Sequence, residues 1–300
     1  MADRKSAESR PGLPRAVARA GMCKMPILSA RARLAGIIGW PVAHSRSPWL
    51  HNRWLEQHGI DGAYVPLLVA PGTFETAVHG LVACRFAGGN VTIPHKEAAF
   101  AICDARDERA ERAGAVNTLL FRDGVIEGRN TDGWGFCENL RWHGVDPAAG
   151  PALLLGAGGG ARAVAAALQE HGVAVTVANR TPERGKALAE ALGVKTLPWD
   201  SASAALAGYA LLVNCTSLGM TGHPPLAFDL SAASPSLTVT DLVYAPLETE
   251  LLAAAKAHGL RAVDGLGMLL HQARAGFHAW FGVMPDVNAA LYSAAAAGLP

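Results

Sequence analysis

The sequence lacks an excess of either charge, and this absence narrows the range of partners. Its 300 residues include 26 Lys and Arg against 25 Asp and Glu, which leaves a formal net charge of +1. Proteins that bind nucleic acid through phosphate contacts usually carry a basic excess, so we expect no nucleic-acid partner. Half of the residues are hydrophobic and 17% are charged, which is also unlike the composition of a disordered chain.

Cysteine and histidine are poorly placed for disulfides or metals. The five cysteines are odd in number, and no two of them form a C-x-x-C motif. The eleven histidines show neither H-x-x-x-H nor H-E-x-x-H spacing. We therefore expect no metal cofactor and no disulfide framework, and this cysteine usage suits the reducing cytoplasm.

Long apolar runs are also missing, so we expect no membrane association. The longest uncharged stretch, residues 201–228, is interrupted by Asn, Thr, Ser, Gly, His and Pro, whereas a spanning helix needs about 20 mostly apolar residues. Residues 1–24 are rich in Arg, Ala, Ser and Gly and lack the apolar core of a signal peptide. We interpret residues 1–24 as a flexible extension.

Strands and helices alternate along the rest of the chain, which predicts an α/β protein with parallel sheets in about two domains. In the first half we expect strands at residues 34–39, 63–68 and 88–93, then a hairpin of 116–121 and 125–129 around Asp123-Gly124. Ser47 and Thr181, each followed by proline, are expected to cap helices. The second half should contain strands at 152–155, 173–178, 210–213, 237–241 and 260–263, then a helical tail from 266, broken at 282–285.

A glycine-rich run after the strand expected at 152–155 predicts a dinucleotide site. It opens a helix and follows the pattern G-x-G-x-x-A, in which glycines let the backbone approach a pyrophosphate at a helix N-terminus. After the next strand come Asn179-Arg180-Thr181 and Arg184, where NAD sites usually carry a carboxylate. A guanidinium pairs with a 2′-phosphate, so we predict NADP rather than NAD. The alternative is that both arginines are solvated surface charges.

Two charged residues are candidates for proton transfer. Lys96 lies in the first turn of a helix expected after Pro94, where the helix dipole disfavours a cation, so its position suggests a function. Asp132 follows the hairpin at the start of another expected helix, where capping is the alternative role. Ser45 and Ser47 are two residues apart, so their hydroxyls can point to one side and hold a carboxylate.

Several short motifs follow one another along the chain in a fixed order. They are Gly39-Trp40-Pro41-Val42-Ala43-His44-Ser45-Arg46-Ser47-Pro48, Asn90-Val91-Thr92-Ile93-Pro94-His95-Lys96, Gly114-Ala115-Val116-Asn117-Thr118, Asn130-Thr131-Asp132-Gly133, the glycine run, Asn179-Arg180-Thr181, Asn214-Cys215-Thr216-Ser217-Leu218-Gly219-Met220, Asp241-Leu242-Val243-Tyr244 and Asp264-Gly265-Leu266-Gly267-Met268-Leu269-Leu270-His271-Gln272-Ala273. Taken together, these motifs resemble the shikimate dehydrogenase family, in the family's order, from about residue 25 to the C-terminus. The departures are residues 1–24, which have no counterpart, and Gly160, where many relatives carry Ala.

The resemblance implies NADPH-dependent reduction of 3-dehydroshikimate to shikimate, on the route to chorismate and the aromatic amino acids. It implies a substrate-binding catalytic domain at residues 25–131, completed by helices within 266–300, and an NADP-binding Rossmann domain at 132–265. The small molecule and NADP(H) would be the partners, without metal, membrane or nucleic acid. The resemblance leaves the choice between a monomer and a homodimer open.

The resemblance also implies a role for each residue that matches a family motif. Lys96 and Asp132 would form the catalytic pair. The substrate-binding residues would be Ser45, Ser47, Asn90, Thr92, Lys96, Asn117, Asp132, Tyr244 and Gln272. The cofactor-binding residues would be Gly156, Ala157, Gly158, Gly159, Gly160 and Ala161 at the pyrophosphate, Asn179, Arg180, Thr181 and Arg184 at the 2′-phosphate, and Met220, Leu242 and Gly265 near the nicotinamide.

Two alternatives share part of this pattern. A quinate/shikimate dehydrogenase using NAD or NADP would carry the same motifs, and only the arginines after the second strand of the nucleotide half favour the NADP enzyme. A non-catalytic NADP-binding sensor would keep the glycine run and Arg180, but it would have no reason to keep Lys96 and Asp132 together.

Overall fold

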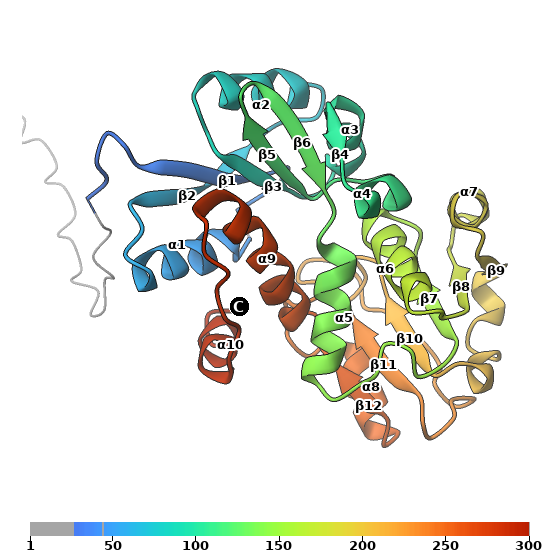
Figure 1. Ribbon diagram of the computed structural model, residues 1–300. Helices are drawn as coiled ribbons and strands as arrows, with labels where there is room; N and C mark the ends of the chain where they lie inside the picture. The colour runs from blue at the N-terminus through green and yellow to red at the C-terminus, as the bar shows by residue number, and fades with distance from the viewer. Residues whose placement is uncertain (1–26, 44, 300) are drawn as a thin grey trace, which may run out of the picture.

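The computed structural model describes residues 27–43 and 45–299, which form two six-stranded sheets connected by helices (Figure 1). The proposed extension at residues 1–24 lies outside the described residues, as does His44. The α/β class predicted from the alternation of strands and helices is confirmed, with one sheet in each half of the chain.

The first sheet has the order β2-β1-β3-β5-β6-β4 and is only partly parallel. Its parallel part is β1 (Arg33–Gly39) between β2 (Gly62–Leu68) and β3 (Gly88–Val91). The expected hairpin forms between β5 (Thr118–Arg122) and β6 (Val125–Arg129), and Asp123 and Gly124 take the positive φ angles that a two-residue hairpin turn requires. The other elements are α1 (Ser47–Gln57), α2 (Phe74–Ala83), α3 (Lys96–Ile102), β4 (Ala105–Arg106) and α4 (Glu108–Ala113).

The second sheet is entirely parallel, with the order β12-β11-β10-β7-β8-β9. Read from β9, this is the strand order of doubly wound dinucleotide-binding sheets, in which the order reverses between the first and fourth strands, here β7 and β10. Ligands of such sheets bind at the carboxyl ends of these two strands. The elements are β7 (Ala152–Leu155), α6 (Gly159–Glu170), β8 (Val175–Ala178), α7 (Pro182–Leu192), β9 (Lys195–Leu197), β10 (Leu211–Asn214), β11 (Thr238–Asp241), α8 (Glu250–Ala257) and β12 (Arg261–Val263).

Two long helices connect the sheets. Helix α5 (Asp132–Trp142) leads from the first sheet into the second, and α9 (Leu266–Phe281) returns to lie beside it (Figure 1). The helices approach so closely at Gly135 that an added Cβ would lie 2.6 Å from the Cβ of Gln272. Leu270 and Phe277 of α9 pack in one core with Trp54 of α1, so the returning helix completes the first half of the molecule. Helix α10 (Ala289–Ala296) follows.

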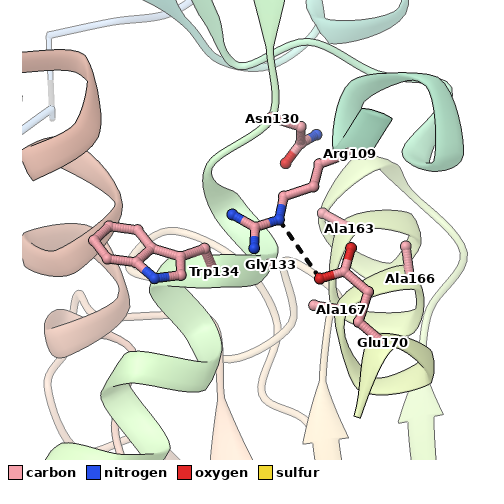
Figure 2. A pocket seen from close by; sticks show the side chains of 8 residues that line it. All are labelled: Arg109, Asn130, Gly133, Trp134, Ala163, Ala166, Ala167 and Glu170. Carbon is pink, nitrogen blue, oxygen red and sulfur yellow. Dashed lines mark ion pairs between the residues drawn. The ribbon is translucent and has the colours of Figure 1, made fainter. Parts of the chain in front are cut away.

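Helices α4 and α6 make a second connection between the halves. Arg109 of α4 and Glu170 of α6 form an ion pair with 3.5 Å between Nε and Oε2 (Figure 2). Arg112 Nη1 lies 3.7 Å from the other oxygen of the same carboxylate. The space beside this pair and Trp134 encloses about 10 Å³, room for about one water molecule. This contact therefore joins the two halves of the molecule.

The prediction that Ser47 caps a helix is wrong. Arg46 occupies the N-cap position with nearly helical angles (φ −85°, ψ −9°), and Ser47 is the first residue of α1. The Ser47 N–H donates to the Ser45 hydroxyl over 3.3 Å, so it is Ser45 that satisfies a free N–H at this end of the helix. Thr181 does occupy the N-cap position of α7 before Pro182, although its side chain makes no capping hydrogen bond.

Candidate active site

An ion pair between two helix starts lies at the junction of the two halves. Lys96 is the first residue of α3 and Asp132 is the first residue of α5. The Lys96 Nζ lies 2.5 Å from the Asp132 Oδ2, although 36 positions separate them in the sequence. The lysine side chain is 20% exposed and the aspartate 8% exposed. The amine is therefore accessible to a small molecule, while the carboxylate that holds it is largely buried.

The same lysine lies against the glycine-rich run of the second half. A Cβ added at Gly159, the first residue of α6, would lie 3.5 Å from the Lys96 Cδ. The junction thus places a cation of the first half beside the helix N-terminus of the dinucleotide-binding fold. Such a helix start provides free N–H groups for an anionic ligand.

The Asp132 carboxylate is held by a buried amide network. The Asn117 Nδ2 donates to Asp132 Oδ1 over 2.8 Å, to Thr131 Oγ1 over 3.0 Å and to Gln272 Oε1 over 3.2 Å. The network connects the residue before β5 with the start of α5 and with α9, and its four side chains are all at most 8% exposed. Three of the residues expected at the substrate, Asn117, Asp132 and Gln272, are therefore brought together.

Asn90, on β3, lies behind this group. Its Nδ2 donates to the Asn117 carbonyl and to Thr118 Oγ1, both over 3.2 Å, and its Oδ1 accepts from the Tyr64 hydroxyl over 2.6 Å. Both amide hydrogens are therefore used within the protein. Thr92 follows β3 and is partly exposed, and its methyl group lies against the place where Gly39 would carry a Cβ.

The expected carboxylate-binding residues also lie near one another. Ser45 is partly exposed, whereas Ser47 is 2% exposed, and the N–H of Ser47 joins them. Burial raises the pKa of Tyr244, which a hydrogen bond from the Arg46 backbone partly opposes. Tyr244 comes from the loop after β11, so its phenol reaches the turn between the two serines from the second half of the chain.

The glycine run has the geometry that its pattern predicts. Gly156 has a φ of +111°, and an added Cβ would lie 3.0 Å from the Thr216 Cγ2, so a side chain there would be strained and crowded. Leu242 packs near both Gly160 and Gly265, where added Cβ atoms would lie 3.2 Å and 2.6 Å from its atoms. The glycine run and the residues expected at the nicotinamide therefore meet at the carboxyl edge of the second sheet, and Met220 lies in the turn after β10.

The residues expected at the 2′-phosphate lie at the end of β8. The Asn179 Nδ2 donates to the Thr181 carbonyl over 2.7 Å and shapes the turn into α7. Arg180 and Arg184 are both exposed, and within residues 27–43 and 45–299 neither side chain forms an ion pair. Two unpaired guanidinium groups beside a dinucleotide fold suit a phosphate.

The described residues contain neither a cluster of metal ligands nor a membrane-spanning helix. There, no three His, Cys, Asp or Glu side chains gather as a metal site would require. No helix in the same residues is long and apolar enough to cross a bilayer. The four described cysteines, Cys84, Cys103, Cys137 and Cys215, are free thiols.

The sequence reasoning missed three residues of this site. Thr118 and Thr131 join the amide network around Asn117, and Tyr64 holds Asn90. Thr118 and Thr131 belong to motifs quoted above but have no charge to single them out. No sequence signal singles out Tyr64, because its inward-facing position on β2 is one that ordinary core residues share.

Three family models match the chain in succession. They describe the shikimate dehydrogenase substrate binding domain at residues 37–119, shikimate/quinate 5-dehydrogenase at 146–220, and the shikimate 5′-dehydrogenase C-terminal domain at 265–291. Shikimate dehydrogenase (NADP(+)) of Acidiphilium cryptum is 65% identical over 273 residues, which cover 91% of this chain and 99% of that protein.

Solved structures are similar over nearly their whole length. Shikimate 5-dehydrogenase of Thermus thermophilus, in complex with NADP(H) and shikimate, is 40% identical with a TM-score of 0.81, over 88% of this chain and 98% of that one. Quinate dehydrogenase of Corynebacterium glutamicum, in complex with NAD, is 32% identical with a TM-score of 0.81. The match covers 87% of this chain and 98% of that one.

Proposed function

The chain belongs to the shikimate dehydrogenase family, and from that premise we propose how its residues carry out the reversible reduction of 3-dehydroshikimate to shikimate. It is an NADP-dependent oxidoreductase that acts on a CH–OH group, in the route to chorismate and aromatic amino acids. The observation that carries the assignment of roles is the contact between Lys96 and Asp132 beside Gly159.

Lys96 is the proton donor in the proposed mechanism. Bound NADPH would supply a hydride to the ketone carbon, and the ketone oxygen would then gain negative charge. An ammonium group beside that oxygen stabilises the charge and then donates its proton. Asp132 holds the ammonium through its Oδ2 while Asn117 fixes the Oδ1, so the amine has one position. In the reverse direction, a neutral Lys96 takes the proton from the substrate hydroxyl.

In the proposed arrangement, the remaining substrate residues form two groups, one at the substrate carboxylate and one at the ring hydroxyls. Ser45 and Ser47 hold the carboxylate, with Tyr244 contributing its phenol from the opposite half of the chain. The ring hydroxyls are held from the amide network and from the partly exposed Thr92. This group comprises Thr92, Asn117, Asp132 and Gln272, with Asn90 behind it.

The cofactor residues proposed here fit a dinucleotide with a 2′-phosphate. Gly156 to Ala161 are assigned to the pyrophosphate, because this run opens α6 and a Cβ added at Gly158 would meet no protein atom within 4 Å. Asn179, Arg180, Thr181 and Arg184 form an exposed edge with two unpaired cations. Met220, Leu242 and Gly265 lie at the carboxyl edge of the second sheet and are assigned to the nicotinamide.

We divide the chain into a substrate domain at residues 25–131 with 266–300 and a nucleotide domain at 132–265. The two sheets support this division, since the first ends with β6 and the second begins with β7. We propose the cytoplasm as the location, which the four free thiols support. Light scattering of the purified protein would decide between a monomer and a homodimer.

Spectroscopic assay at 340 nm tests the proposed function directly. Shikimate and quinate are each assayed with NADP⁺ and with NAD⁺. Quinate is included because the chain is also similar to a quinate dehydrogenase. The proposal predicts the highest kcat/KM for shikimate with NADP⁺. A higher kcat/KM for quinate with NAD⁺ would assign the chain to quinate oxidation instead.

A further inference from the structure

A buried tyrosine connects the two ends of the proposed substrate site. Tyr64 is 1% exposed on β2, and its hydroxyl donates to the Asn90 Oδ1 over 2.6 Å. We propose that Tyr64 is a positioning residue for the substrate, because its hydroxyl fixes the Asn90 amide, whose own hydrogen bonds lead to Asn117 and Thr118. This inference rests on the proposed function, which places Ser47 at the substrate carboxylate and Asn90 behind the residues that hold the ring hydroxyls.

The strand register explains how Tyr64 reaches Asn90 across an intervening strand. Tyr64 pairs with Ala35 of β1, and Ile37 of β1 pairs with Asn90 of β3, so all of these side chains lie on one face of the sheet. The strands are adjacent in the order β2-β1-β3 (Figure 1). Ala35 is completely buried and small, which leaves space for the phenol ring to cross β1.

The hydroxyl of Tyr64 has two functional neighbours. Burial raises the pKa of Tyr64 well above its ordinary value, and hydrogen bonds from the Asn90 backbone and the Ser47 side chain lower it in part. The phenol therefore stays neutral, and its hydroxyl donates a hydrogen bond to the Asn90 Oδ1. A neutral hydroxyl that does not titrate serves to orient its neighbours rather than to transfer protons.

The connection continues from Asn90 to the catalytic pair. With its Oδ1 occupied by Tyr64, the Asn90 amide directs both hydrogens to the Asn117 carbonyl and Thr118 Oγ1. Thr118 Oγ1 donates to Asn117 Oδ1 over 3.0 Å, and Asn117 holds Asp132. Without the Tyr64 hydroxyl, the Asn90 Oδ1 loses the donor that fixes its direction, and the amide can turn over.

The ring of Tyr64 is held independently of its hydroxyl. It stacks on His51 with 4.0 Å between ring centroids and 8° between planes, and it lies 5.8 Å from Trp280. Burial lowers the pKa of His51 to about 3, so the stacked imidazole is uncharged near neutral pH. Tyr64→Phe therefore keeps the ring packing and removes only the hydroxyl, so it tests the role of the hydroxyl alone.

The experiment measures shikimate and NADP⁺ kinetics in Tyr64→Phe. Losing the hydroxyl leaves a buried acceptor without its donor, so we expect the KM for shikimate to rise about 5- to 30-fold. The kcat should fall less than about threefold, since Lys96 and Asp132 are retained, and the KM for NADP⁺ should stay within about twofold. An unchanged shikimate KM in Tyr64→Phe would overturn the inference.

A matched control and a double variant separate positioning from general stability. Tyr292→Phe also removes one phenol hydrogen bond, 2.5 Å to Asp264 Oδ2, from a residue outside the proposed site, and should leave the shikimate KM within about twofold. Ser47→Ala with Tyr64→Phe should raise KM little more than Ser47→Ala alone, because coupled residues are not additive. Fully additive effects would contradict the link to Ser47. If the wild-type enzyme does not oxidise shikimate at all, the proposed function fails and this inference fails with it.

Discussion

Gly135→Ala tests whether the packing of α5 on α9 positions Gln272. An added Cβ would lie 2.6 Å from the Gln272 Cβ, 2.7 Å from its backbone N and 2.9 Å from its Cα. Carbon atoms in contact normally lie about 3.6 Å apart, so the helices must separate by roughly 1 Å. Two of the three neighbours are backbone atoms, and a rotamer change cannot relieve those contacts. Overpacking of this kind costs about 1–3 kcal/mol of unfolding free energy.

The displacement should also reach the chemistry, because Gln272 accepts a hydrogen bond from Asn117, which holds Asp132. A shift of roughly 1 Å can cost about 10- to 100-fold in rate, so we expect kcat/KM for shikimate to fall by that factor. The KM for NADP⁺ should change less than about twofold, since α6 and Arg180 are untouched.

Gly80→Ala is the matched control for this substitution. Gly80 lies inside helix α2, and an added Cβ would meet no atom within 4 Å. Alanine favours the helix there by about 1 kcal/mol, so this variant should be slightly more stable and fully active. Urea unfolding and initial rates at 340 nm would measure both variants. A Gly135→Ala enzyme as stable and as active as Gly80→Ala would refute the packing argument.

Two further predictions concern acid stability and cofactor choice. The unfolded chain protonates His51 below pH 6.5, whereas the buried His51, with a pKa of about 3, stays neutral in the fold. The unfolding free energy should therefore fall as the pH drops from 6.5 towards 3, and His51 should account for about 2 kcal/mol of the loss between pH 7 and 5. Urea unfolding at both pH values should show that loss reduced by this amount in His51→Phe; equal losses in the two proteins would show that His51 is not the acid-sensitive group. For Arg180→Ala, we expect the preference for NADPH over NADH in kcat/KM to narrow about 10-fold, through a higher KM for NADPH. An unchanged ratio would contradict the assignment of the 2′-phosphate edge.

Continuously apolar strands could be predicted from the sequence, whereas very short or mainly charged elements could not. Strand β7 lies at the predicted residues 152–155, because a buried parallel strand is a continuous apolar run. Strand β4 has two residues, too few for any periodicity, and α4 is mainly charged, with Ala110 and Ala113 as its only buried side chains. Helix α8 and strand β9 were missed as well, although α8 contains the buried Leu251 and Leu252.

The candidate site could be predicted where one residue type in one local setting carries information. Lys96 at a helix start and glycines after a strand are such cases. The links between side chains could not be predicted, because they depend on register and helix packing. Tyr64 reaches Asn90 only because β1 lies between their strands with Ala35 at the crossing point. The prediction that Ser47 caps α1 was wrong for a similar reason. The nearly helical conformation of Arg46 makes Arg46 the N-cap, so the helix begins one residue earlier than predicted.

The steady-state kcat of Lys96→Ala tests the catalytic pair most directly. The comparison is Lys256→Ala, which removes an exposed lysine whose Nζ lies 2.7 Å from Glu248 and which should keep wild-type activity. General acid–base catalysis contributes about 10²- to 10⁴-fold, so the kcat of Lys96→Ala for shikimate should fall by that factor. A near-normal kcat with only a raised KM would show that Lys96 binds substrate without transferring its proton, and would contradict the proposed mechanism.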